Sequence, residues 1–281
     1  MPQPKIFGTV AVERFSVIAS DVTRDRLFDG KLVLYQPARG YRVGVDALLL
    51  AAFAAEGRRA RLAVDLGAGV GAVALALIEL GAAERVELVE REPELFELAR
   101  QNLALSGARG QVHRADLEQQ GLPRALAGRA ELVVSNPPFF ERTSTRPQKE
   151  HLSRAARSGE LEPFVAAAAR ALAQGRGRAV FAYPSRSLAT LFLVAREVGL
   201  EPKRMRLVHP RVDRAARLAL VELKRAKPGG LVVEAPLIEW IGPGRRSAEL
   251  KAIVSGKKHA PRAQRPSKRS NRMAAAARTL R

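Results

Sequence analysis

The chain has 281 residues, of which 47% are hydrophobic, 48 are Lys or Arg and 28 are Asp or Glu, giving a formal net charge of +20. This length and apolar content allow one domain with a substantial core and room for an appendage. The absence of Cys excludes disulfides, thiolate nucleophiles and Cys-based metal sites in this chain. The four His residues are scattered without ligand spacing, so we expect no metal site.

The first 60 residues are too short for an independent domain. They carry an apolar strand at 32–35 and a helix at 46–55, which we expect to pack beside the ligand as an N-terminal cap. Residues 1–5 lack the apolar core of a signal peptide, and no apolar run reaches the length of a membrane span. We therefore expect a cytoplasmic protein with no membrane partner.

An apolar strand at 62–66 then runs into a loop with Gly67, Gly69 and Gly71, followed by a helix predicted at 72–80. Glycines allow positive φ and close approach of a ligand to the backbone, and the helix N-terminus offers free N–H groups. The spacing Gly67-x-Gly69-x-x-Ala72 also satisfies a loose dinucleotide pattern. An NAD enzyme is therefore one alternative.

Acidic residues accompany three successive strands. Asp65 lies two residues before the first glycine, Glu90 ends a strand at 85–90, and Asp116 ends a strand at 111–116. Ligands of open parallel sheets bind outside the carboxyl ends of the strands. Asp65 suits a cationic aminoacid-bearing ligand better than a pyrophosphate, Glu90 is placed for ribose hydroxyls and Asp116 for an adenine amino group. This pattern favours S-adenosylmethionine as the cofactor.

A fourth strand at 132–134 ends in the turn Ser135-Asn136-Pro137-Pro138-Phe139. Proline fixes φ, lacks an N–H and pushes the preceding residue towards an extended conformation, so this turn is pre-shaped. The Asn136 side-chain oxygen and the Pro137 carbonyl can accept the two hydrogens of a planar amino group, while Phe139 stacks on the attached plane. An ordinary strand-to-loop exit is the alternative interpretation.

The remaining elements continue the alternation, with helices predicted at 161–173 and 188–198 and strands at 178–182, 203–208 and 217–223. Regular strand–helix alternation indicates a parallel sheet covered on both faces. We predict an α/β fold of the Rossmann-like, doubly wound type.

Positive charge gathers in two further segments. Arg142, Arg146, Arg154 and Arg157 follow the Asn-Pro-Pro-Phe turn and form a candidate RNA-binding loop. Residues 255–281 are basic, lack acids and read as a disordered tail. Such a tail attracts phosphate backbones without reading sequence, although a compositional bias towards Arg would also explain it.

The glycine loop with Asp65 and the turn with Asn136 resemble class I S-adenosylmethionine-dependent methyltransferases that modify amino nitrogens. The segments 35–37 and 40–50, together with 154–157, 181–184 and 217–222, resemble the bacterial tRNA1(Val) adenine-N6 methyltransferase family. The resemblance covers about residues 27–254 and implies a mainly parallel seven-stranded sheet whose last strand is antiparallel. The divisions it suggests are a cap at 1–60, a methyltransferase domain at 61–254 and the tail at 255–281.

The resemblance implies N6-methylation of an anticodon-loop adenine in tRNA, with Asn136, Pro137 and Phe139 at the acceptor base and the acids and glycines at the cofactor. No strong base is required for this chemistry, and a monomer is favoured. Other amino-nitrogen substrates remain open, namely adenine N6 of ribosomal RNA or DNA and glutamine N5 of a release factor. The release-factor enzymes carry a helical domain before the glycine loop, whereas only 64 residues precede Asp65 here. A non-catalytic RNA-binding protein on the same scaffold is the alternative from another class.

Overall fold

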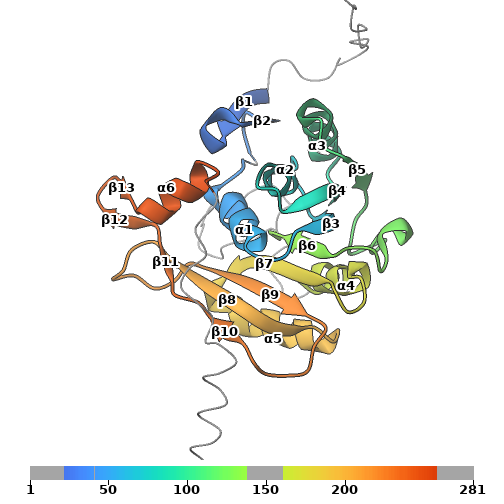
Figure 1. Ribbon diagram of the computed structural model, residues 1–281. Coiled ribbons are helices and arrows are strands. Elements are labelled where there is room, and N and C mark those ends of the chain that lie inside the picture. Colours follow the sequence, from blue (N-terminus) through green and yellow to red (C-terminus); the bar gives the residue numbers. More distant parts are fainter. Residues whose placement is uncertain (1–21, 41, 138–160, 258–281) are drawn as a thin grey trace, which may run out of the picture.

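The computed structural model describes residues 22–40, 42–137 and 161–257 and places a mixed sheet between two layers of helices (Figure 1). The long strands are β3 (Ala60–Leu66), β4 (Ala83–Glu90), β5 (Gly110–Arg114), β6 (Leu132–Ser135), β7 (Arg178–Pro184), β8 (Glu201–His209) and β9 (Leu218–Lys224). The helices are α1 (Val45–Ala55), α2 (Ala72–Glu79), α3 (Pro93–Ser106), α4 (Leu161–Ala171), α5 (Leu188–Glu197) and α6 (Ala248–Val254).

The strand order is β10-β8-β9-β7-β6-β3-β4-β5, and β9 is antiparallel to both of its neighbours. The seven long strands therefore form the expected mainly parallel sheet with an antiparallel seventh strand. Two additional strands of two residues each, β10 (Val232–Val233) and β11 (Leu237–Ile238), pair along β8 and bring this sheet to nine strands. Their shortness explains why the sequence pattern did not predict them.

The sheet has a topological switch point between β3 and β6. From β3 the chain builds outward through β4 to β5 and then returns to the other side of β3 with β6. Doubly wound sheets bind ligands in the crevice at this point. Leu66 and Ser135 are paired across the two strands, so the glycine loop and the Asn-Pro-Pro turn leave the sheet side by side.

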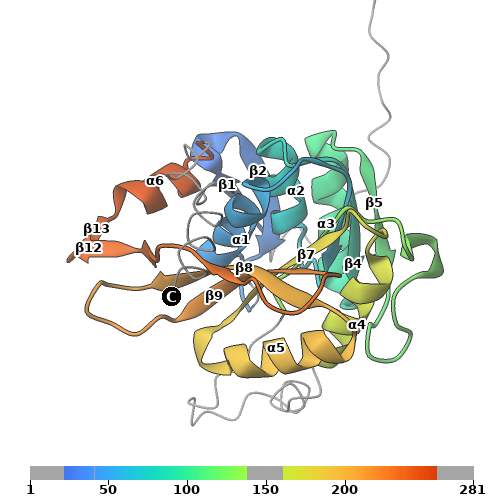
Figure 2. The ribbon, with the colours of Figure 1, turned by 60° about the horizontal axis from the view of Figure 1, so that its bottom comes forward.

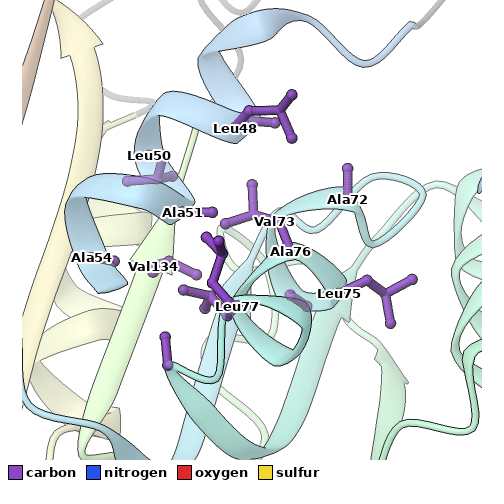
Figure 3. Packing of buried hydrophobic residues seen from close by; sticks show 14 of the residues in the cluster. Leu48, Leu50, Ala51, Ala54, Ala72, Val73, Leu75, Ala76, Leu77 and Val134 are labelled. Carbon is purple, nitrogen blue, oxygen red and sulfur yellow. The ribbon is translucent and has the colours of Figure 1, made fainter. Parts of the chain in front are cut away.

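Each face of the sheet carries its own hydrophobic core. Side chains alternate between faces along a strand, so Ala63 packs with α1, α2 and α3 while its neighbour Val64 packs with α4 and α5. Figure 3 shows the first of these cores, in which Ala51 of α1 faces Val73 and Leu77 of α2 above Val134 of β6. Small residues let α1 approach α2, the helix that follows the glycine loop, closely.

An antiparallel hairpin precedes α1 and consists of β1 (Val22–Leu27) and β2 (Leu32–Pro37). Its turn contains Phe28, which is 1% exposed and lies against α6: a Cβ on Gly256 would be 2.8 Å from it. The hairpin and α1 share one core with the sheet. The hairpin at residues 22–37 is thus packed against α6 and the sheet.

A buried ionic network joins the sheet to the C-terminal end of α1. Arg204 of β8 donates to the carbonyl of Phe53 (2.7 Å) and to the carboxylates of Glu56 (2.7 Å) and Glu222 (3.2 Å). Arg178 of β7 donates to the carbonyl oxygen of Ala54 at 3.1 Å. The two arginines therefore cap the C-terminal end of α1, since the last carbonyls of a helix have no partner within it.

Candidate active site at the carboxyl ends of β3 to β6

The loop after β3 is shaped by its glycines. Gly67, Gly69 and Gly71 have φ angles of 70°, 56° and 88°, in the left-handed region that other residues rarely adopt. A Cβ on Gly67 would lie 2.8 Å from the ring of Phe164, and one on Gly71 would lie 2.9 Å from the side chain of Leu88. Conformation and space both exclude a side chain at Gly67 and Gly71.

Asp65 lies below this loop and is only 2% exposed. Its Oδ2 accepts a hydrogen bond from the backbone N–H of Ala74, in the first turn of α2 (3.0 Å). Burial raises the pKa of this carboxyl to about 7, the bond from Ala74 opposes the shift, and the nearby charge of Glu90 adds to it. A buried carboxylate next to a second one provides a strong site for a cation.

Glu90, at the end of β4, holds the glycine loop. The backbone N–H of Gly69 donates to its Oε2 (2.7 Å), while those of Arg91 and Glu92 donate to its Oε1 (2.8 and 2.9 Å). The side chain is 6% exposed. Glu90 therefore fixes the loop against β4 and places a negative charge beside it, a structural role that the sequence alone did not reveal.

Asp116 follows β5 and is partly exposed, with 21% of its side chain accessible. Its Oδ1 accepts from the backbone N–H groups of Glu118 (2.8 Å) and Gln119 (3.4 Å), which fixes the carboxylate in a turn. Its Oδ2 lies 4.0 Å from a guanidinium nitrogen of Arg91. One oxygen is thus anchored by the backbone, and the other has capacity to accept from a ligand.

Asn136 is the first residue after β6, and its Oδ1 is buried without a hydrogen-bond partner within the described part of the chain. A buried acceptor without a donor costs about 1–3 kcal/mol and calls for an explanation. Its neighbours are fixed: the Ser135 hydroxyl donates to the carbonyl of Leu66 (2.9 Å), and Pro137 is buried. The oxygen is therefore available to a donor that the described residues do not supply.

Two further residues at this site were not identified from the sequence. Asn102 of α3 is fully buried, its amide donates to the carbonyls of Tyr35 (2.8 Å) and Val70 (2.9 Å), and its Oδ1 accepts from the N–H of Tyr35 (2.8 Å). It ties the β1–β2 hairpin to the glycine loop. A single Asn on the apolar face of a helix was its signal. Glu162, two residues before Phe164, has a buried Oε2 without a partner in the described structure.

Other predicted site residues cannot be placed. Phe139 and the basic run Arg142, Arg146, Arg154 and Arg157 lie outside the described residues, as does the tail from residue 258 onward. Within the described ranges no group of three or more His, Asp or Glu could hold a metal ion, and no helix is long and apolar enough to cross a membrane.

A hollow of about 390 Å³ lies at the opposite edge of the sheet. It is lined by Arg61, Glu84, Arg85 and Arg109, near the amino ends of β3, β4 and β5. None of the residues of the glycine loop borders it, and neither does Asn136 or Pro137. The hollow is therefore separate from the candidate site.

Comparison with known proteins agrees with this geometry. Residues 44–177 match the family model of the methyltransferase small domain. The tRNA1(Val) (adenine(37)-N6)-methyltransferase of Porphyromonas gingivalis is 32% identical over 171 residues, which make up 58% of this chain and 67% of that relative. The chain belongs to the tRNA1(Val) adenine-N6 methyltransferase family. It is a methyltransferase.

The chain is also similar to a methyltransferase with another substrate and to a methyltransferase of known structure. The release factor glutamine methyltransferase of Deinococcus radiodurans is 32% identical over 172 residues, 58% of this chain and 58% of that protein. The crystal structure of a predicted O-methyltransferase from Agrobacterium tumefaciens superposes with a TM-score of 0.58 at 27% identity, covering 78% of this chain and all of that one. The α/β methyltransferase fold is thereby confirmed.

S-adenosylmethionine is the cofactor of this methyltransferase family, and the nicotinamide alternative is wrong for this chain. The residues present fit the group. A glycine loop in left-handed conformation would present its backbone to the aminoacid portion, and the buried Asp65 carboxyl would complement the positive charge. The acids after β4 and β5 complement hydroxyl and amino donors.

Proposed function

We propose that this methyltransferase modifies the N6 amino group of an adenine in the anticodon loop of tRNA. The observation that carries the proposal is the Oδ1 of Asn136, which is buried without a partner in the described structure. Asn136 directly follows Ser135 of β6, and Ser135 is paired with Leu66, the residue before the glycine loop. Paired residues on adjacent strands lie about 5 Å apart. An amino group bound to Asn136 would thus lie beside the cofactor loop.

The residues that we expect to hold the cofactor lie at the same edge of the sheet. Asp65 and the loop from Gly67 to Gly71 would hold the aminoacid end of S-adenosylmethionine, Glu90 the ribose hydroxyls and Asp116 the adenine. When bound, S-adenosylmethionine supplies an electrophilic methyl group on a sulfonium. Backbone N–H groups use three of the about four acceptor positions of the Glu90 carboxylate, one on Oε2 and two on Oε1. Oε2 would accept from the ribose with its remaining lone pair.

The protein's own contribution is positioning. The exocyclic nitrogen of adenine is a weak nucleophile because its lone pair is delocalised into the ring. Asn136 Oδ1 and the Pro137 carbonyl would accept its two hydrogens, draw the nitrogen towards tetrahedral geometry and aim its lone pair at the methyl group. Correct orientation of reactants lowers barriers by several kcal/mol. Phe139 would stack on the base, worth about 1–3 kcal/mol, and a loop base is easily extruded.

Glutamine N5 of a release factor is the second candidate substrate, because release factor glutamine methyltransferases are also similar to this chain. It too presents a planar amino group to an Asn-Pro-Pro turn. The experiment that separates the two is incubation with labelled S-adenosylmethionine and total tRNA, release factor or ribosomal RNA, followed by nucleoside and amino-acid analysis. We expect N6-methyladenosine in the tRNA fraction; label in release-factor glutamine instead would refute the tRNA proposal.

We also propose that the N-terminal segment up to residue 60 acts as a cap for the cofactor, on the methyltransferase domain at 61–254. The hydrogen bonds of Asn102 support this role because they connect β2 directly to the carbonyl of Val70 in the glycine loop. Any displacement of the hairpin would therefore disturb the loop.

Cofactor affinity should depend on pH through Asp65. Its pKa in the folded protein is about 7, above the ordinary value of 3.8, so the folded protein without cofactor retains a proton that the unfolded chain loses. The associated stability is fully present below about pH 4 and lost as the pH rises through 7. A cationic ligand requires the ionised form, so S-adenosylmethionine should bind about tenfold more tightly at pH 8 than at pH 6.

Isothermal calorimetry of wild type and Asp65→Asn across this pH range tests the linkage. Wild type should release a proton on binding below pH 7, visible as a dependence of the measured heat on buffer ionisation enthalpy. Asp65→Asn should bind more weakly at pH 8, with a flat pH profile. An equally steep profile in the variant would assign the titration to another group.

Replacing Glu90 by Gln should weaken cofactor binding by about 1.5–3 kcal/mol, the range for a hydrogen bond to a charged group. Gln keeps a carbonyl oxygen that can accept from the Gly69 N–H, so the loop is disturbed less than by Ala. The matched control is Glu94→Gln, in the first turn of α3, where the side chain is exposed. Calorimetric affinity unchanged in Glu90→Gln would remove this residue from the site.

A further inference from the structure

A basic hairpin projects from the same edge of the sheet that carries Asn136. It consists of β12 (Trp240–Gly242) and β13 (Arg245–Arg246), paired antiparallel, and Figure 2 shows it extending beyond the end of β8. Arg245 and Arg246 are exposed. Neither guanidinium has a carboxylate of the described chain within 4.0 Å. Five of the eight other arginines on the described strands have a carboxylate partner, namely Arg61, Arg85, Arg178, Arg204 and Arg206, whereas Arg245 and Arg246 face solvent.

The hairpin is rigidly attached. The backbone N–H groups of Glu239 and Trp240 donate to the carbonyls of His209 and Pro210, both at 2.9 Å, and so continue the pairing of β11 with β8. At the other end of the hairpin, the backbone N–H of Ser247 donates a hydrogen bond to the carbonyl of Glu239 (2.8 Å). Its hydroxyl then caps α6. The hairpin is thus fixed at both ends.

A second set of bonds connects the hairpin base to the cofactor side of the domain. The carboxylate of Glu239 accepts two hydrogen bonds from Arg217 (2.6 and 2.7 Å), and the same guanidinium donates to Asp46 at the start of α1 (2.6 Å). Helix α1 packs on α2, the helix that follows the glycine loop (Figure 3). The hairpin therefore has a defined position relative to the cofactor loop.

Its surface has the chemistry of a phosphate-backbone contact. The guanidinium of Arg246 lies over the ring of Trp240, 5.6 Å from its centroid, which orients the side chain. The neighbouring loop after β8 adds Arg214 and also Arg211, which lies 3.3 Å from Asp213, the one acid of that loop. Arginine in such surfaces forms bidentate bonds with phosphate oxygens.

The spacing suits an RNA whose target base lies at Asn136. Strand β8 is three strands away from β6 in the sheet, or about 15 Å at about 5 Å per strand. This separation brings nucleotides flanking an extruded base over the hairpin, while the base itself occupies the turn.

We propose that the β12–β13 hairpin, through Arg245 and Arg246, binds the phosphate backbone of the substrate RNA near its modified base. This proposal rests on the proposed tRNA substrate and adds the surface that recognises it. An acidic protein partner would offer carboxylates to the same arginines, and the experiment below distinguishes the two.

The test compares Arg245→Gln/Arg246→Gln with Arg109→Gln/Arg176→Gln, which removes two exposed charges at the amino ends of β5 and β7. Binding of total tRNA is measured at several salt concentrations without turnover. The hairpin variant should bind several-fold to about tenfold more weakly, and its log–log salt slope should fall by about 1.4–1.8, the increment for two phosphate contacts. The control should behave like wild type.

Kinetics separate this inference from the proposed function. In the hairpin variant KM for tRNA should rise several-fold, while kcat, S-adenosylmethionine affinity and thermal stability stay unchanged. A salt slope equal to that of wild type, or an equal loss in the control, would overturn the hairpin proposal even if tRNA is methylated. If wild type methylates release factor and not tRNA, the proposed function fails; higher KM for that protein in the hairpin variant would then assign the arginines to a protein partner.

Discussion

We expect Asn136→Ala to lose at least about 100-fold in kcat while its S-adenosylmethionine affinity stays within a few-fold of wild type. Removing one pre-organised hydrogen-bonding group from an active site costs about 10²–10³ in kcat. Here the group lost is a buried oxygen that no described part of the protein satisfies. Its partner would be the acceptor amine, so the cofactor should bind independently of it. Single-turnover methyl transfer and calorimetry measure the two quantities.

Asn136→Asp is the matched control, since it keeps an acceptor oxygen in nearly the same place and replaces the amide NH₂ by a second oxygen, which carries a negative charge when ionised. We expect it to retain more activity than Asn136→Ala. The fold should be preserved in both variants because the Ser135 hydroxyl and the pairing of β6 with β3 remain. A rate near that of wild type in Asn136→Ala would show that acceptor positioning does not depend on this side chain.

The part of the site that sequence predicted well is encoded locally. Gly67 and Gly71 have backbone conformations and steric surroundings that only glycine fits. The glycines themselves therefore allow the loop to be predicted from a single sequence. The positions of Glu90, Asp116 and Asn136 followed from strand ends, because the carboxyl ends of parallel strands share one edge. The predicted strands and helices correspondingly agree with the structure to within a few residues.

What the sequence did not predict depends on partners far apart in the chain. Asn102 bonds to Tyr35 across 67 residues, and Arg204 bonds to Glu56 across 148. Read in isolation, an Arg in a strand is assigned to solvent, because Arg is seldom buried unless paired. Only the fold brings the pairing groups together. The short strands β12 and β13 escaped prediction for a different reason, since their two or three residues show no periodicity.

The buried network around Arg204 gives the largest expected effect on stability. Arg204→Met should lower the free energy of unfolding by about 3–5 kcal/mol, the usual cost of removing one member of a buried ion pair. Glu222, which is 4% exposed, would lose its 3.2 Å partner, and the carbonyl of Phe53 would lose its donor. The contact of the guanidinium with the Phe53 ring, at 3.7 Å, would also disappear. Urea denaturation measures the change.

Two further variants test whether the loss of stability in Arg204→Met arises from the burial of the ion pair. Arg100→Met removes an exposed partner of Glu97 in α3, a pair with side chains 61% and 49% exposed, and should cost no more than about 0.5 kcal/mol. Adding Glu222→Gln to Arg204→Met should recover part of the loss, because it removes a buried charge that has lost one of its partners and keeps only Lys224 and Arg178. The network lies towards the amino ends of β7 and β8, away from Asn136, so folded Arg204→Met should keep its kcat. Equal unfolding midpoints for Arg204→Met and Arg100→Met would mean that the network adds no stability; a lost kcat with intact fold would mean that it reaches the active site.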